Sequence, residues 1–333
     1  MKKKDNKKKT YRLFYLLLLL FVTTITLSFS SYAWFTANRL VSIDLLNVNV
    51  RAQGGIEISV DGTNWKSVLT VMDIENARNN YPNSLNQLPN TLEPVSTSLD
   101  IENGKLKMFY GTAINNTSGK YILETVRSVE EESFGDNSSG KFIVFDLFFK
   151  TNQDTMIYLT PDSKVTYSGE SSVGIENAAR VAFIDEGTTF TGSSINVIQS
   201  LITNNSEDVY IWEPNYDTHT QHSIDNALNL YGISINSPGN KISYDGVTSE
   251  ITRNLGITVD KANSTMYPMY FKNVDVDISS VNGFTNNIEA FNLRSGISKY
   301  RIYMWIEGQD VDCENNASFG NMAFNLQFTT NPS

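Results

Sequence analysis

The stretch of sequence that decides the fold is KFIVFDLFFK, residues 141–150. Nearly every position between its two lysines is apolar, and aromatic and β-branched side chains are frequent. A short run of this composition predicts a strand that is buried on both faces. Two further strands are expected near the end of the chain, YRIYMWIE at residues 300–307 and MAFNLQFT at residues 322–329.

Much of the remaining chain consists of short apolar runs with a period of two, which is typical of β-strands. Such runs lie at residues 42–50, 156–159, 164–167, 233–235 and 269–278. Between residues 55–60 and residues 65–70 stands Asp61-Gly62-Thr63-Asn64. This tetrapeptide predicts a hairpin turn, because glycine readily adopts the positive φ that such turns need.

Helical patterns are confined to three short stretches, residues 175–180, 194–203 and 224–231. Many strands with few short helices predict an all-β sandwich. The β-sandwich domain is expected to span residues 37–333. Residues 186–265, which are richer in Asn, Ser and Thr, are expected to form a loop-rich insertion within it.

The charge of the chain is unevenly distributed. Residues 1–12 hold six Lys, one Arg and one Asp, a local charge of +6, whereas the whole chain carries −10. The rest of the chain therefore carries −16. A body this acidic repels the phosphates of nucleic acid, so no nucleic-acid partner is expected. Cys313 is the single cysteine, which excludes an intrachain disulfide.

The N-terminal segment has the three parts of a secretory signal. Residues 1–12 are basic, residues 13–30 form the uncharged run LFYLLLLLFVTTITLSFS, and Ser31-Tyr32-Ala33 follows. Cleavage after Ala33 places Ser31 and Ala33 at the two positions where a signal peptidase requires small residues, and makes Trp34 the first residue.

The same segment is long enough to remain in the membrane. Its uncharged sequence continues through residue 36, and the 24 residues from 13 to 36 can span a bilayer as a helix. Residues 1–36 are therefore predicted to be a hydrophobic N-terminal helix, either a cleaved signal peptide or a retained signal anchor. The expected location is extracellular or at the cell surface, with membrane association if the segment is uncleaved.

The stretch SYAWFTAN at residues 31–38 resembles the signal-peptide junction of the TasA/camelysin family of exported Gram-positive surface proteins. A dedicated signal peptidase cuts that junction. Three further stretches are similar to related Bacillota proteins: GIEISVDGTNW at residues 55–65, ENAARVAF at 176–183 and RIYMWIEGQDVDC at 301–313. These matches cover roughly a fifth of the chain, at both ends and in the middle.

The resemblance implies a jelly-roll-like β-sandwich that is exported and, in some members, polymerises into biofilm matrix fibres. In those fibres an N-terminal strand freed by cleavage completes the sheet of the next subunit, and residues 34–50 occupy that position here. In strand addition, main-chain hydrogen bonds supply affinity and alternate side chains set the register.

Camelysin-like proteins are also described as metalloproteases, which makes a zinc centre worth testing. A His-Glu-x-x-His centre needs two histidines on one helical face and a glutamate as base. The two histidines of this chain stand in His219-Thr220-Gln221-His222, where Gln221 cannot act as a base. Asp217 or Asp225 would have to complete such a site, and a polar loop is the simpler interpretation.

An acidic loop near the C-terminal end is the second candidate metal site. Its carboxylates are Glu307, Asp310, Asp312 and Glu314. Alternating carboxylates beside a glycine could hold Ca²⁺, although the EF-hand spacing is absent, and a solvated turn between two strands is the alternative. Cys313 lies between two of these acids, whose charge disfavours a reactive thiolate, so it is not expected to be a nucleophile. Trp305 is expected in the core.

These features predict a non-enzymatic structural protein of the cell surface or matrix that uses no cofactor and self-assembles into fibres by strand addition. Its expected partners are copies of itself, cell-wall or matrix polymers, the signal peptidase and, through the N-terminal segment, the membrane. A membrane-anchored extracellular binding or adhesion module is the alternative. A secreted metallopeptidase is a third interpretation.

Overall fold

The computed structural model describes residues 43–115, 121–130, 140–169, 174–216, 218–226, 228–229, 243–281, 283–313 and 320–332. The predicted signal segment with Ser31, Ala33 and Trp34 lies outside these residues, as do Asp217, Glu314 and the strand predicted at residues 233–235. Within the described part of the chain, no helix combines the length and hydropathy that a membrane span requires.

Two large sheets dominate the described residues. Sheet 1 has the strand order β19-β12-β21-β1-β3, with β13 beside β21 and β5 beside β1. Its strands are β1 (Ile43–Ala52), β3 (Val68–Leu69), β5 (Thr91–Leu92), β12 (Thr155–Leu159), β13 (Lys164–Ser168), β19 (Ile288–Leu293) and β21 (Asn321–Thr329).

Sheet 2 has the strand order β18-β15-β14-β20-β11-β2, with β4 also paired to β11. Its strands are β2 (Glu57–Ser59), β4 (Asn86–Gln87), β11 (Ile143–Thr151), β14 (Ala179–Thr189), β15 (Val209–Glu213), β18 (Ile278–Ser279) and β20 (Gly296–Ile306).

The facing sides of the two sheets share one hydrophobic core. Ile302 and Met304 of β20 and Phe324 of β21 belong to the same buried cluster. Phe149 of β11 meets Phe328 of β21 edge to face, with ring centroids 5.2 Å apart. Because successive side chains of a strand point to opposite faces, every second residue of each strand reaches this core. The predicted all-β sandwich is confirmed.

Sheet 2 is also buried on its second face, the face turned away from sheet 1. Val144, Tyr303 and Trp305 lie there in a separate apolar cluster. Within β11 only Lys150 falls short of full burial, so the strand predicted at residues 141–150 is indeed buried on both sides. Trp305 is fully buried, as expected.

Three small sheets supply residues to the cluster on this second face. Val95, Met108 and Val274 are among them. The small sheets are the three-stranded β10-β9-β6 and the pairs β16-β17 and β7-β8. Their strands are β6 (Val95–Ser96), β7 (Ile101–Glu102), β8 (Lys105–Leu106), β9 (Met108–Asn115), β10 (Tyr121–Ser128), β16 (Tyr244–Val247) and β17 (Phe271–Val274).

The described helices are short. They are the α-helices α2 (Val71–Asn76), α3 (Ile195–Gln199) and α4 (Gln221–Asn226), and the 3₁₀ turns η2 (Ala77–Asn79), η3 (Ile175–Ala178), η4 (Ser206–Asp208), η6 (Arg253–Leu255) and η7 (Val259–Lys261). The helix predicted at residues 175–180 is wrong at its end, because Ala179 and Arg180 already pair with β20. Sheet pairing overrides the local helical preference there.

The stretch at residues 186–265, expected to be a loop-rich insertion, contributes strands to the surrounding sheets. β15 pairs with β14 inside sheet 2, and β16 pairs with β17.

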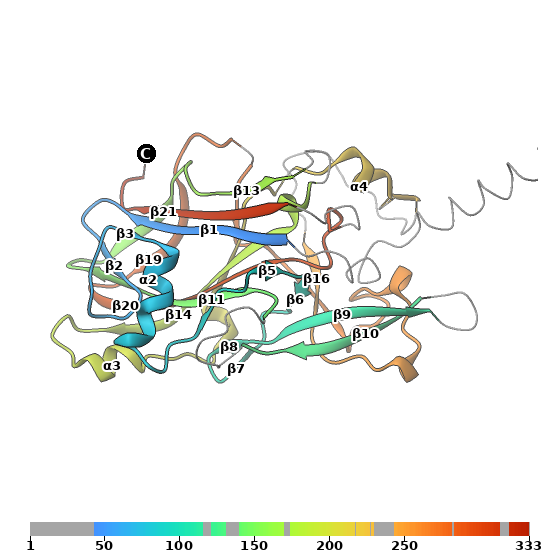
Figure 1. The fold of residues 1–333 in the computed structure, drawn as a ribbon, viewed down its shortest axis with the longest axis horizontal. Coiled ribbons are helices and arrows are strands. Elements are labelled where there is room, and N and C mark those ends of the chain that lie inside the picture. The colour runs from blue at the N-terminus through green and yellow to red at the C-terminus, as the bar shows by residue number, and fades with distance from the viewer. Residues whose placement is uncertain are drawn as a thin grey trace, which may run out of the picture. The chain divides into compact units, whose positions relative to one another are not determined.

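The first and last described strands lie side by side, as Figure 1 shows for β1 in blue and β21 in red. They run parallel, with partners from Asp44 and Asn321 at one end to Ala52 and Phe328 at the other. Parallel neighbours cannot be joined by a tight turn, and here nearly the whole domain separates them in sequence. The first and last described strands of the sandwich are therefore neighbours in sheet 1.

The predicted turn at residues 61–64 is present, but its flanking strands do not form a regular hairpin. Gly62 has a φ of +74°, and the Asp61 carboxylate accepts hydrogen bonds from the backbone N–H groups of Thr63 and Asn64, each at 2.8 Å. After a single bridge between Ile58 and Lys66, β2 joins β11 in sheet 2 whereas β3 joins β1 in sheet 1. The turn thus links the two sheets.

Candidate metal centre

The carboxylates of Asp310 and Asp312 are brought together by the tight turns that follow β20. The backbone N–H of Asp310 donates to the carbonyl of Glu307 at 3.2 Å, and that of Cys313 donates to the carbonyl of Asp310 at 3.1 Å. The N–H of Asp312 donates to Asp310 Oδ1 at 2.8 Å. With these turns formed, carboxylate oxygens of Asp310 and Asp312 lie within 4.8 Å of each other.

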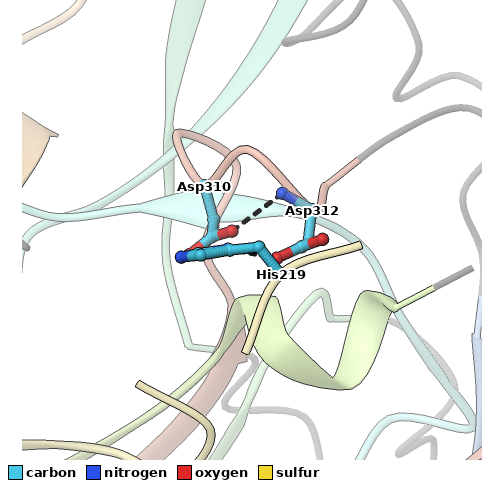
Figure 2. Close-up of side chains that lie close together, drawn as sticks. All are labelled: His219, Asp310 and Asp312. Carbon is cyan, nitrogen blue, oxygen red and sulfur yellow. Dashed lines mark hydrogen bonds and ion pairs between the residues drawn. The ribbon is translucent and has the colours of Figure 1, made fainter. Parts of the chain in front are cut away.

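His219 reaches the same place from a distant part of the sequence, the segment between β15 and α4. Its Nδ1 lies 2.5 Å from Asp312 Oδ2, and the N–H of Thr220 donates to Asp312 Oδ1 at 3.0 Å. Figure 2 shows the imidazole ring lying across the two carboxylates. One potential ligand atom from each of His219, Asp310 and Asp312 lies within 4.8 Å of the others.

The site is almost completely buried. The side chains of His219, Asp310 and Asp312 are 7%, 4% and 0% exposed. Gly174 makes this closeness possible, because a Cβ there would stand 2.4 Å from a Thr220 methyl carbon and 3.2 Å from Asp312 Oδ1. The φ of Gly174 is +67°, which glycine adopts without strain.

A buried arginine neighbours this group. Arg180 of β14 places Nη2 2.6 Å from Asp310 Oδ2 and 3.2 Å from Glu213 Oε1, at the end of β15. Its Nη1 donates to the carbonyls of Asn177 and Ala179 at 3.1 and 3.0 Å. Glu307 accepts hydrogen bonds from Trp305 Nε1 and from the N–H of Gln309, each at 3.0 Å.

Burial dominates the electrostatics of the acids. It raises the pKa of Glu213 to about 7 despite Arg180, and the pKa of Glu307 to about 7 despite the hydrogen bond from Trp305. Burial also raises the pKa of Asp312. For His219, burial lowers the pKa, but the hydrogen bond to Asp312 and the nearby charges of Asp310 outweigh it, and the pKa is raised.

The structure brings together part of each predicted site. Asp310 and Asp312 of the acidic loop join His219 of the histidine pair. Glu307 is buried beside them but does not belong to the three-residue group, and Glu314 lies outside the described residues. The loop is not a solvated turn where it is described, since Glu307, Asp310 and Asp312 are all buried.

The other candidates lie elsewhere. His222 is exposed on α4, and Asp225 on the same helix accepts a hydrogen bond from Gln221 at 2.9 Å. Cys313 is 1% exposed, in the sandwich core. Sequence reasoning treated His219 and the acidic loop separately, because the 93 positions between His219 and Asp312 hide their contact.

A second ionic cluster lies on the second face of sheet 2. Asp146 of β11 accepts from Arg301 Nε at 2.8 Å and from the Tyr81 hydroxyl at 3.0 Å, and lies 3.4 Å from Lys299 Nζ. Glu186 of β14 lies 2.9 Å from Arg301 Nη1, and burial raises its pKa to about 7. Sequence analysis missed this cluster, whose only signal is charged residues inside otherwise apolar strands.

No protein-family model matches the sequence, and no curated protein and no solved structure matches it either. The resemblance to the TasA/camelysin family therefore stays an expectation that rests on the residues quoted for it.

Proposed function

We propose that this chain is an exported, non-enzymatic protein of the cell surface or matrix, whose copies assemble by exchanging β1. Export is supported by the basic and apolar N-terminal sequence with its Ser31-Tyr32-Ala33 ending. The position of β1 in sheet 1 is the observation that carries the assembly proposal.

β1 contributes to the sandwich along its whole length on one side and only at its ends on the other. Beside β21, it buries Val48, Val50 and Ala52. On the opposite flank, the described pairing is limited to two residues with β5 and two with β3. A strand held in this way can be replaced by an identical strand in the same register.

The strand also comes first after the predicted cleavage point, so it would be tethered to its own domain at one end only. Such a strand can leave the sheet without being pulled through a closed loop of the chain. Its departure exposes the edge of β21 and empties the core positions of Val48, Val50 and Ala52. The β1 strand of another copy restores the same hydrogen bonds and the same burial. Exchange of an identical element is a low-cost route to assembly.

The first test compares residues 34–333 with a variant that lacks residues 34–52. We expect the longer form to assemble into β-rich filaments, seen by electron microscopy, and the deletion to abolish them. A peptide of residues 43–52 added to the truncated form should raise its melting temperature. The same peptide with Val48→Asp and Val50→Asp should not, because charges cannot enter the core.

Two results would contradict the proposal. One is filament formation by the truncated form as readily as by its parent. The other is an equal effect of the two peptides on the melting temperature, because only the unaltered peptide can take the place of β1 beside β21.

The non-enzymatic part of the proposal is supported by the placement of the two histidines. His219 is buried against Asp312, whereas His222 is exposed on α4. A His-Glu-x-x-His centre needs both rings on one ion, and His222 does not belong to the group of potential ligands among the described residues.

A polar groove on the outer face of sheet 1 favours the alternative, a membrane-anchored binding module. The groove has a volume of about 250 Å³ and is lined by Asn49, Arg51, Asp162, Lys164, Asn325, Leu326 and Gln327. Mass spectrometry of the N-terminus of the protein from its native envelope separates the two functions. Trp34 as the first residue supports release and strand exchange, and an intact Met1 or Lys2 supports an anchored module.

A further inference from the structure

We propose that the polar groove on the outer face of sheet 1 binds an oxyanion carried by a hydroxyl-rich chain, as in an acidic polysaccharide or a polymer of glycerol phosphate. The anion is a carboxylate or a phosphodiester, each with a single negative charge. The inference rests on the binding function given above as the alternative, and it names the ligand of that function. It uses β1 in its observed place and does not depend on exchange of that strand.

Three neighbouring strands form the groove, and Figure 1 shows β13, β21 and β1 side by side. Asn49 and Arg51 of β1 alternate with residues of the core, so their side chains point to the outer face. Asn325 and Gln327 of β21 do the same, and they are the register partners of Asn49 and Arg51. On the other side of β21, Lys164 of β13 is paired with Asn325. The two cations therefore lie on the outer strands, with amides between them.

The lining of the groove is positively charged in an otherwise acidic domain. Arg51 and Lys164 carry two positive charges and Asp162 carries one negative charge, which leaves +1 at the groove. Neither cation takes part in an ion pair within the described part of the chain. Charges farther away than about 8 Å are largely screened at physiological ionic strength, so this local excess governs an approaching ligand. A ligand group with one negative charge complements it.

The side chain of Gln327 is a second, independent observation. The residue is only 8% exposed, and its hydrogen bonds with Thr160 and Ser163 use its backbone atoms alone. Its side-chain amide has no hydrogen-bond partner among the described residues. Buried polar groups are nearly always hydrogen-bonded, so a nearly buried amide that lines a groove is placed to bond with what enters there.

The residue types at the groove select a charged and hydroxylated ligand. Arginine holds carboxylate or phosphate oxygens with two parallel N–H donors, and lysine adds a point charge. The amides and the Asp162 carboxylate suit hydroxyl groups. None of the described lining residues is aromatic, so no flat apolar surface is offered to a neutral sugar ring. The groove, of about 250 Å³, is smaller than the roughly 300 to 1,000 Å³ of drug-sized sites, which suits one or two units of a chain.

The experiment uses the full chain in a non-ionic detergent. Trimers of glucuronic acid, of glycerol phosphate and of glucose are titrated into it at about 0.15 M salt, where long-range attraction is screened, and binding is followed by calorimetry. We expect saturable binding of one or both acidic trimers and none of the neutral trimer. The trimer that binds identifies the anion as a carboxylate or a phosphodiester.

Arg51→Gln and Lys164→Gln should each weaken the binding about 10-fold, because each removes a charge-assisted hydrogen bond. Both side chains are exposed, so the melting temperature should stay that of the parent. Arg253→Gln is the matched control. Arg253 is exposed on η6, outside the groove, and its replacement changes the net charge equally. This variant should bind like the parent.

Three results would overturn the proposal. They are absence of saturable binding of both acidic trimers to the parent chain, equal binding of the glucose trimer, and an equal loss of affinity in Arg51→Gln and Arg253→Gln. The last result would show attraction by net charge alone. None of these measurements requires filaments, so a parent chain that binds an acidic trimer but does not assemble contradicts only the exchange of β1.

Discussion

Asp146 is the residue on which the second ionic cluster depends. Its side chain is completely buried, with Arg301 and Lys299 as its cationic neighbours. Burial raises the pKa of Asp146, but these two cations outweigh it and lower the pKa, so the residue is charged in the folded chain. Burial has the opposite effect on Lys299, whose pKa is lowered. The cluster is balanced only while all members are present.

We expect Asp146→Asn to lower the free energy of unfolding by about 3 to 5 kcal/mol, because it leaves buried cations without their carboxylate. Glu57→Gln is the control, since the Glu57–Lys150 pair is formed by side chains that are 52% and 32% exposed. That change should cost at most about 1 kcal/mol. Urea denaturation of the two variants measures both values, and equal losses would refute the role assigned to Asp146.

Single residues also mark the limit of what sequence can predict about the candidate site. Asp310 and Asp312 were recognisable because they alternate within one loop. Their partner His219 was not, because contacts over such a separation follow from the path of the whole chain. The nearest signal in the sequence was Gly174. The reason for a glycine there is the close approach of Thr220 and Asp312, which only the structure shows.

At the scale of elements, the turn at residues 61–64 connects the two sheets. Gly62 has a positive φ, and a Cβ at this position would stand 3.1 Å from Ile198 Cγ2 and 3.3 Å from Ile195 Cδ1 of α3. The turn therefore depends on glycine for both its conformation and its packing.

We expect Gly62→Ala to lower the free energy of unfolding by about 1 to 2 kcal/mol, the cost of the left-handed conformation for a residue with a side chain, and by more if α3 cannot move. Gly192→Ala is the matched control, because no atom lies within 4 Å of the added methyl group and no positive φ is required. Thermal unfolding compares the two. If Gly192→Ala were as unstable as Gly62→Ala, the special requirement for glycine at position 62 would be refuted.

Local patterns predicted elements where one physical effect dominates. The apolar run of β11 and the Asp-Gly turn are such cases, and both are confirmed. The start of β14 was predicted as helix, because the local sequence favours a helix there. That prediction is wrong because Ala179 pairs with Ile306 of β20, which makes it part of a strand. Similarly, the turn at residues 61–64 indicated a hairpin, but its two flanking strands belong to different sheets. β2 pairs with the longer strand β11, and β3 pairs with the longer strand β1.

For the whole molecule, the main consequence of the fold is the closure of sheet 1 by β1. The alternation in residues 42–50 predicted a strand there, and the run at residues 322–329 predicted another near the end of the chain. The parallel register with β21 could not be predicted, because two strands so far apart in sequence have many possible partners. In the proposed assembly, that place beside β21 is filled by the β1 strand of a neighbouring chain.

The register provides a direct measurement of this point. Asn49 of β1 pairs with Asn325 of β21, and Asn49 Nδ2 donates to Asn325 Oδ1 at 3.2 Å. One preparation of residues 34–333 carries Asn49→Cys and another carries Asn325→Cys, and the two are mixed during assembly and then oxidised. The native Cys313 is buried and is unchanged in both.

Exchange of β1 predicts a disulfide-linked dimer that contains one chain of each variant, found in the filaments on a non-reducing gel and absent when either variant is oxidised alone. A chain that carries both cysteines should form a ladder of covalent multimers. If the mixture gives no mixed dimer and the double variant closes its disulfide only within single chains, β1 stays in its own sandwich and the proposed assembly is wrong.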